Sequence, residues 1–184
     1  ARVQSPTLAQ IVAYVIESSD NEGAEVLLRH AGLAAGRRGS FDGGAAAVRA
    51  TLGRLGADMS GVRIFDGSGL SRDNRVTLDA LVDTLQVAAS PAQADLRPVV
   101  SGLPVAGFNG SLAYRFVTFG EDGRGLVRAK TGTLSGVNAL VGVTVDRDGT
   151  PLAFAAVADR VRLIDTLDAR AALDVLTARI ASCC

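Results

Sequence analysis

The sequence predicts an α/β fold of the α+β kind, in which an all-helical region precedes an antiparallel sheet flanked by helices. Two patterns lead to this prediction. Apolar residues recur at helical spacing through most of residues 5–102, and the period changes to that of β-strands between residues 126 and 158. Because 48% of the 184 residues are apolar and 21% are charged, we expect one domain over residues 1–184 with one buried core.

Helices are expected first, and each begins at a residue that favours a helix start. Pro6 lies in the first turn of the earliest one, Ser40 and Thr77 precede two others, and Ser90-Pro91 opens the last of this region. The apolar spacing places these helices at about residues 5–18, 24–31, 40–55, 77–85 and 90–102.

A short strand and a polar loop interrupt the helices. Residues 62–65 (VRIF) indicate a strand that leads into residues 66–74 (DGSGLSRDN), where two glycines permit unusual backbone angles. Loops of this kind often carry functional sites. Residues 103–119 show no single period.

The last third of the chain predicts three sequential antiparallel strands and a closing helix. The strands are expected at residues 126–133, 137–145 and 152–158, with a hairpin turn at Asp146–Gly149. Apolar residues from Ala169 to Ile180 then lie on one helical face, which predicts that the final helix packs on the sheet.

Composition and charge exclude several classes of partner. Nucleic acid is not expected, since 19 basic residues balance 19 acidic ones and aromatic residues make up only 4%. The longest apolar runs, such as residues 152–158, are far shorter than the roughly 20 residues that span a bilayer. Residues 1–4 do not resemble a secretion signal, so such a signal was either removed or never present.

Metal and cofactor chemistry are not expected either. His30 is the only histidine and is interpreted as structural, and the adjacent Cys183 and Cys184 cannot form a zinc site by themselves. These two cysteines can pair with each other, pair with another chain or remain free, so they do not reveal the redox compartment.

Lys130-Thr-Gly-Thr133 is the first segment with a chemical character of its own. It offers a cation, two hydroxyls and a backbone N–H at one rim of a strand, which suits a carboxylate beside a reacting carbonyl. Gly132 lets a ligand lie close to that strand. The competing interpretation is an ordinary surface lysine on an edge strand.

Ser19-Asp-Asn21 is the second such segment. Ser19 and Glu22 have the Ser-x-x-Glu spacing of a capping box, which by itself explains a serine at a helix start. A catalytic role is compatible with capping, because a rigid turn would fix both a hydroxyl and an amide.

These strings resemble those of a known family. Ser19-Asp-Asn21 and Lys130-Thr-Gly-Thr133 are similar to the second and third motifs of the active-site-serine enzymes that recognise penicillin. Together with residues 66–74, 103–112 (LPVAGFNGSL) and 129–137 (AKTGTLSGV), they resemble the D-alanyl-D-alanine carboxypeptidase/endopeptidase family, the class C low-molecular-mass penicillin-binding proteins. The resemblance implies a penicillin-binding protein/β-lactamase-like transpeptidase fold.

One motif of that family is absent from this sequence. Its nucleophile lies in Ser-x-x-Lys, but Lys130 is the only lysine and Val127 stands three residues before it. We therefore expect residues 1–184 to be the C-terminal part of the catalytic domain, inactive alone and completed by an N-terminal segment or chain that carries the motif. Alone, it would expose a sheet edge and associate rather than remain an independent monomer. Loss of catalysis is the alternative.

The resemblance implies a serine-type carboxypeptidase that cleaves peptidoglycan stem peptides through an acyl-enzyme and is acylated by β-lactams. It also implies roles for residues present here. Ser19 relays a proton, Asn21 holds the substrate amide and Lys130 tunes the serine hydroxyls. The Thr133 N–H is an oxyanion donor, and the terminal carboxylate meets the hydroxyls of Thr131 and Thr133.

Ser71 and Arg72 are expected to contact the side chain of the stem peptide. The alternative for Arg72 is that it braces its own loop through a contact with Asp66. An extracytoplasmic location in a bacterium, in the periplasm or cell envelope, follows from the substrate. Two other functions stay open: a β-lactamase-like hydrolase or esterase on the same scaffold, and a catalytically inactive module that binds peptidoglycan or a partner through the Lys130 rim.

Overall fold

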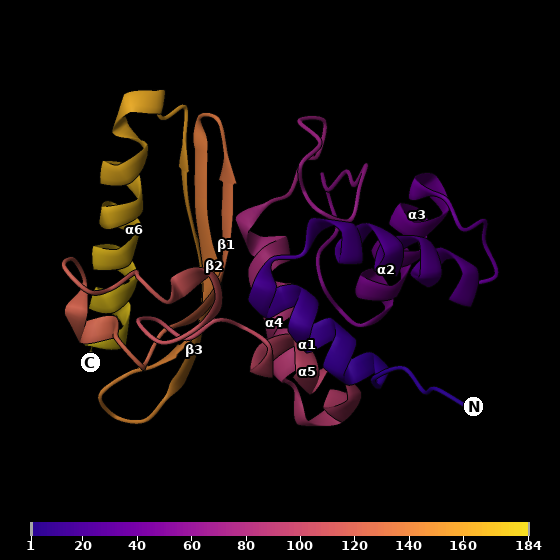
Figure 1. Ribbon diagram of the computed structural model, residues 1–184, viewed down its shortest axis with the longest axis horizontal. Coiled ribbons are helices and arrows are strands. Elements are labelled where there is room, and N and C mark those ends of the chain that lie inside the picture. Colours follow the sequence, from indigo (N-terminus) through magenta and orange to yellow (C-terminus); the bar gives the residue numbers. More distant parts are fainter. Residues whose placement is uncertain (1, 184) are drawn as a thin grey trace.

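A helical half and a sheet half lie side by side in the computed structural model, which describes residues 2–183 (Figure 1). The helical half contains α1 (Leu8–Ser18), α2 (Asn21–Ala34), α3 (Phe41–Arg54), α4 (Leu78–Ala89) and α5 (Arg97–Ser101). The sheet half contains β1 (Arg128–Leu134), β2 (Val137–Val145), β3 (Pro151–Asp159) and α6 (Thr166–Ala181). Short 3₁₀ helices lie at η1 (Pro91–Leu96), η2 (Gly110–Leu112), η3 (Glu121–Gly123) and η4 (Leu163–Asp165).

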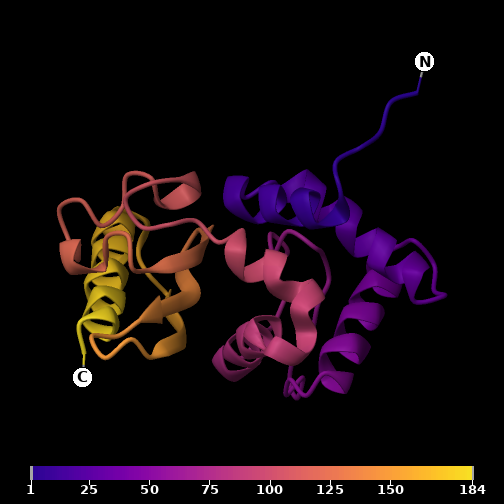
Figure 2. The same ribbon diagram turned by 90° about the horizontal axis from the view of Figure 1, so that it is seen from below.

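The three predicted strands form one antiparallel sheet in the order β1-β2-β3, as expected. Lys130 of β1 lies opposite Val141 of β2, and Thr133 lies opposite Asn138. α6 covers the face of the sheet that is turned away from the helical half, while α4 contacts β2 and β3 (Figures 1 and 2). β1 and β3 are therefore the two edge strands of the described chain.

The buried core lies between the sheet and α6. Alternate residues of β2 point into it, and apolar residues of the 106–127 segment fill the remaining space. Its largest fully buried side chains include those of Phe116, Leu112, Leu140 and Val127. Burial of this apolar surface fixes the sheet on α6, and with it the position of β1.

Side chains cap the helices much as the sequence predicts. The hydroxyls of Ser40 and Thr77 accept hydrogen bonds from backbone N–H groups at the starts of α3 and α4. α1 begins slightly later than expected, because Thr7 and Gln10 form a capping box after Pro6.

Two predicted elements differ in the structure. Residues 62–65 form only an isolated bridge between Arg63 and Arg75, not a strand. The helix expected over residues 90–102 is divided into η1 and α5, with Gln93 in a non-helical conformation at φ −121° and ψ 51°. Pro98 contributes to the break, since proline has no N–H to bond the preceding turn.

No helix among residues 2–183 is long and apolar enough to span a membrane. Two residues lie outside the described part of the chain: Ala1 and Cys184, the second of the two cysteines.

Candidate active site

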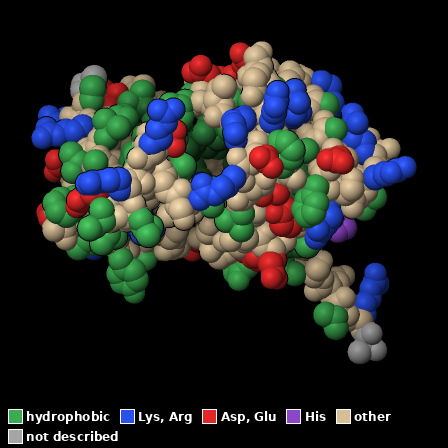
Figure 3. Space-filling view, turned by 90° about the horizontal axis from the view of Figure 1, so that it is seen from above, with side chains coloured by type: hydrophobic (Ala, Val, Ile, Leu, Met, Phe, Trp, Pro, Cys, Tyr) green, Lys and Arg blue, Asp and Glu red, His purple; other side chains and the backbone are tan. Residues whose placement is uncertain are grey.

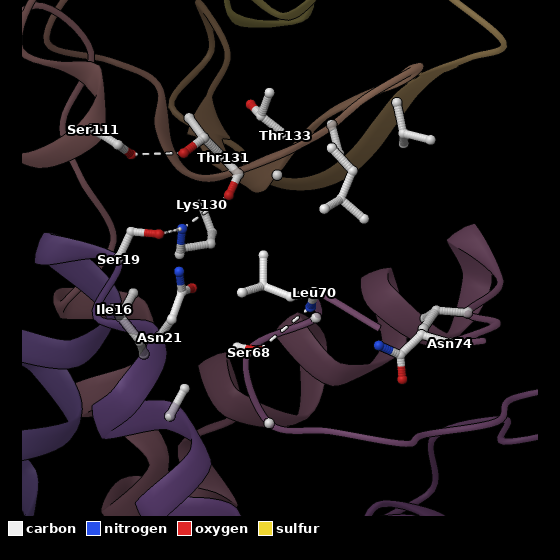
Figure 4. Close-up of a pocket in the computed structure, with 18 of the residues that line it drawn as sticks. Ile16, Ser19, Asn21, Ser68, Leu70, Asn74, Ser111, Lys130, Thr131 and Thr133 are labelled. Carbon is white, nitrogen blue, oxygen red and sulfur yellow. Dashed lines mark hydrogen bonds between the residues drawn. The ribbon is translucent and has the colours of Figure 1, made fainter. Parts of the chain in front are cut away.

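A cleft of about 770 Å³ separates the helical half from β1, and Figure 3 shows the molecular surface hollowed between the two halves. Its walls come from the α1–α2 junction, the loop at residues 67–76, α4 and the sheet. Figure 4 shows side chains of ten of the lining residues by name: Ile16, Ser19, Asn21, Ser68, Leu70, Asn74, Ser111, Lys130, Thr131 and Thr133. Segments distant in sequence thus meet around one space.

Ser19 lies at the junction of α1 and α2 with a left-handed backbone, φ 56° and ψ 45°. The predicted capping box of Ser19 and Glu22 is wrong. Asp20 caps α2 instead, because its carboxylate accepts a hydrogen bond of 2.9 Å from the N–H of Gly23. Because the helix cap lies one residue later than the sequence predicts, the hydroxyl of Ser19 is left for another partner.

That partner is Lys130. Its Nζ donates hydrogen bonds to Ser19 Oγ at 2.6 Å and to the carbonyl oxygen of Thr131 at 2.8 Å (Figure 4). Burial lowers the pKa of Lys130 from the usual 10.5, since desolvation disfavours the ammonium form. Because an ammonium only donates, Ser19 Oγ accepts from it and keeps its own proton available for transfer.

Asn21 is the first residue of α2 and is exposed to the cleft. Its side-chain amide points toward Lys130 in Figure 4. The α1–α2 junction therefore holds a hydroxyl and an amide on the helical wall of the cleft, where they face the ammonium of Lys130 on β1.

The rim of the cleft on the sheet side is formed by three residues of β1: Thr131, Gly132 and Thr133. The hydroxyl of Thr131 is 2.9 Å from that of Ser111, and Thr133 Oγ1 accepts a hydrogen bond of 3.4 Å from Arg170 Nη2. A Cβ atom added to Gly132 would lie only 3.2 Å from that of Ala139, so glycine keeps this part of the strand open.

Ser71 and Arg72 do not line the cleft. Arg72 Nη2 donates to the carbonyl oxygen of Ser135 at 3.1 Å, so its bracing contact runs to the β1–β2 turn and not to Asp66. The Asp66 carboxylate instead accepts hydrogen bonds from the N–H groups of Gly69 and Ser71. These contacts fix the loop that carries Ser68 and Leu70 to the cleft.

Sequence reasoning missed several cleft residues: Ser111, Ser68, Leu70 and Asn74. Two of the strings that carry the family resemblance contain all four, residues 66–74 and 103–112. Their signal was present, but nothing in their local spacing indicates which side chains turn toward the cleft. No group of three or more His, Cys, Asp or Glu side chains suited to a metal ion occurs within residues 2–183.

Comparison with known proteins identifies relatives of the whole chain. A model of the D-Ala-D-Ala carboxypeptidase 3 (S13) family matches residues 1–180. The chain is 40% identical to carboxypeptidase DacB of Mycolicibacterium smegmatis over 100% of this chain and 39% of that protein. It is also 40% identical to a D-alanyl-D-alanine carboxypeptidase of Actinomadura, over 83% of this chain and 28% of that protein.

Solved structures agree with the sequence matches. Penicillin binding protein 4 of Haemophilus influenzae, in complex with a β-lactam, superposes with a TM-score of 0.79 and 25% identity, covering 95% of this chain and 41% of that one. The predicted penicillin-binding protein fold is thereby confirmed. The chain spans about two fifths of the length of these proteins or less.

Proposed function

Because this chain belongs to the D-Ala-D-Ala carboxypeptidase 3 (S13) family, we propose that it forms the C-terminal part of the catalytic domain of a serine-type D-Ala-D-Ala carboxypeptidase/endopeptidase. The observation that supports this most strongly is the contact of 2.6 Å between Lys130 Nζ and Ser19 Oγ, beside a strand with two threonines. A hydroxyl held by a cation lies next to threonine hydroxyls that can donate to a carboxylate. This arrangement suits the cleavage of a peptide that ends in a carboxylate.

The reaction uses a serine outside this sequence, in the Ser-x-x-Lys motif. This serine attacks the carbonyl of the penultimate D-alanine, and the peptide bond to the terminal D-alanine breaks. Ser19 relays the proton that the attacking serine loses to the nitrogen of the leaving D-alanine, and Lys130 supplies positive charge that stabilises the reacting oxygens. Water then attacks the acyl-enzyme and releases the shortened stem peptide.

The remaining residues orient the substrate. Asn21 holds the amide of the stem peptide, and the hydroxyls of Thr131 and Thr133 bind the terminal carboxylate. The N–H of Thr133 is one of two oxyanion donors, a contribution typically worth about 3 kcal/mol of transition-state stabilisation. Ser71 and Arg72 act on the stem side chain indirectly, because their contacts position the loop at the edge of the cleft.

The complementary segment that carries Ser-x-x-Lys covers the β3 edge and the start of α6. β3 has a strand partner on one side only, and an unpaired strand edge favours addition of another strand. Nearby, Leu163, Ile164 and Leu167 are 78%, 84% and 72% exposed. Apolar side chains so exposed beside an open strand suit a partner segment, and the longer relatives have chain length to supply one.

The proposed substrate, peptidoglycan stem peptides, places the complete enzyme outside the cytoplasm of a bacterium, in the periplasm or cell envelope. A β-lactam bound to a solved relative supports β-lactams as ligands of the same cleft. A second candidate is a catalytically inactive module that binds peptidoglycan through the cleft lined by Lys130, Thr131 and Thr133.

Intact mass spectrometry with penicillin tests the proposal. We define the complete enzyme as this chain together with the segment that carries Ser-x-x-Lys. The expected result is one drug adduct on the complete enzyme, at the serine of that segment, and release of D-alanine from a D-Ala-D-Ala peptide. Saturable peptide binding without an adduct or released D-alanine would favour the binding module, while rapid loss of the adduct would indicate a β-lactamase.

A further inference from the structure

Arg170 reaches the cleft rim from the opposite side of the sheet. It belongs to α6, which lies on the face of the sheet turned away from the helical half (Figure 1). Its Nη2 is 3.4 Å from Thr133 Oγ1, and the two residues are 37 positions apart in sequence. α6 is thus in contact with the strand proposed to bind the substrate carboxylate.

The charge of Arg170 has no carboxylate partner among the described residues. Asp174, one helical turn further along α6, would be the natural partner at i+4. Arg115 takes it instead, with contacts of 3.0 and 2.6 Å to its two carboxylate oxygens. The ion pairs found within residues 2–183 do not include Arg170, and its Nε is buried without a hydrogen-bond partner.

The direction of the hydrogen bond determines what Thr133 can do. A guanidinium has donors only, so Thr133 Oγ1 must be the acceptor. The hydroxyl proton of Thr133 then points away from Arg170, and Thr133 itself lines the cleft. A hydroxyl oriented in this way donates to an anion in the cleft, and the adjacent positive charge strengthens that donation.

We propose that Arg170 is a positioning residue for recognition of the substrate's terminal carboxylate. It holds the Thr133 hydroxyl as a donor toward the cleft and adds uncompensated positive charge behind β1. The ligand class is a peptide ending in a free carboxylate, or a β-lactam whose carboxylate takes the same place. This inference rests on the proposed carboxypeptidase function and assigns Arg170 no contact with the reacting atoms.

The test measures KM and kcat of the complete enzyme for a D-Ala-D-Ala peptide. Arg170→Gln removes the charge and is expected to raise KM about tenfold, the loss typical of a charge-assisted hydrogen bond, with kcat within about twofold. Arg170→Lys keeps the charge and restores most of the affinity. Arg179→Gln is the matched control, because Arg179 is an exposed arginine on the same helix.

A second comparison removes the acceptor. In a Thr133→Val background the Arg170→Gln change should raise KM much less than in the parent, since the oriented hydroxyl is already absent. Equal effects in both backgrounds, equal effects of Arg170→Gln and Arg179→Gln, or an unchanged KM would each overturn the role of Arg170. A parent enzyme that releases no D-alanine would instead overturn the proposed function and this inference with it.

Discussion

Ser19 and Lys130 are 111 positions apart in sequence, yet Ser19 Oγ and Lys130 Nζ are 2.6 Å apart. The contact joins the helical half to the edge of the sheet, because Ser19 is the C-cap of α1 and Lys130 lies on β1. Asp20 caps α2, so the hydroxyl of Ser19 is not used as the helix cap, and Lys130 Nζ finds only the carbonyl oxygen of Thr131 on its own strand. The pair is thus a product of how the two halves meet.

Lys130→Met should slow acylation strongly without lowering stability. Loss of the charge is expected to slow acylation of the complete enzyme by penicillin about 10²- to 10³-fold. The free energy of unfolding should change little or increase, because burial of the ammonium is unfavourable. Acylation rates and urea unfolding measure the two effects. Arg128→Met, an exposed change on the same strand, is the control, and a comparable slowing there would argue against a role specific to Lys130.

The pH dependence of acylation should show the lowered pKa of Lys130. The proposed mechanism uses the ammonium form, so the rate should fall as pH rises through a pKa below 10.5. Stability should move in the opposite direction. The unfolded chain binds more protons than the folded one between the two pKa values, so unfolding becomes less favourable as pH rises through that window.

The variant Lys130→Arg is the control for this pH profile. Arginine stays protonated throughout the range, so any activity that remains should lack the alkaline decline. An unchanged decline in that variant would assign the titration to a different group.

Ser19→Gly should separate stability from function. The left-handed backbone at Ser19 costs a residue with a side chain about 1 kcal/mol, which glycine avoids. The variant should therefore unfold at slightly higher denaturant concentration while losing the hydroxyl that is proposed to carry the proton. Asp20→Ala is expected to do the reverse, costing about 1 kcal/mol through loss of the helix cap. A Ser19→Gly enzyme with parental acylation and hydrolysis rates would show that the hydroxyl is dispensable.

Arg115→Ala should destabilise the sheet half strongly. Asp174 is only 7% exposed at its side chain, and without Arg115 its buried charge would lose the one ion pair that it makes within residues 2–183. We expect a loss of about 3–5 kcal/mol in thermal or denaturant unfolding of the complete enzyme. The double variant Arg115→Met with Asp174→Leu should recover most of it, as two apolar side chains avoid the desolvation cost.

The Asp174 carboxyl also predicts the pH response of Arg115→Ala. Burial raises its pKa above the usual 3.8 even beside Arg115, and removal of Arg115 should raise it further. Protonation relieves the buried charge, so the variant should regain stability as pH falls through the folded pKa toward 3.8. A deficit that is independent of pH would contradict this explanation.

Local patterns in the sequence predict most of the elements. Alternation over residues 137–145 and the turn at Asp146–Gly149 predict the β2–β3 hairpin because both depend on neighbouring residues. The cap positions Ser40 and Thr77 were predictable for the same reason. Lys130-Thr-Gly-Thr133 was recognisable because its chemical groups are consecutive on one strand.

Other features depend on contacts that no local pattern contains. Ser19 matches a capping box, but α2 is capped one residue later, where Asp20 accepts from the N–H of Gly23. The partner of Arg72 is Ser135, 63 positions away, and not the nearby Asp66. Arg170 looks like an ordinary polar residue on a helix until the fold places it behind Thr133. Such residues are identified by tertiary structure alone.

The junction of α1 and α2 is short, and its length constrains how this region tolerates insertions and deletions. α1 ends at Ser18 and α2 begins at Asn21, so only Ser19 and Asp20 separate two rigid rods. Since each residue of a helix turns by about 100°, one added residue would rotate Asn21 out of the cleft while Ser19 stayed in place. The exposed hairpin at Asp146–Gly149 has no such coupling. Fusion tags or inserted domains are therefore expected to be accepted at the hairpin and to inactivate the enzyme at the helix junction, even when every side chain of the cleft is retained.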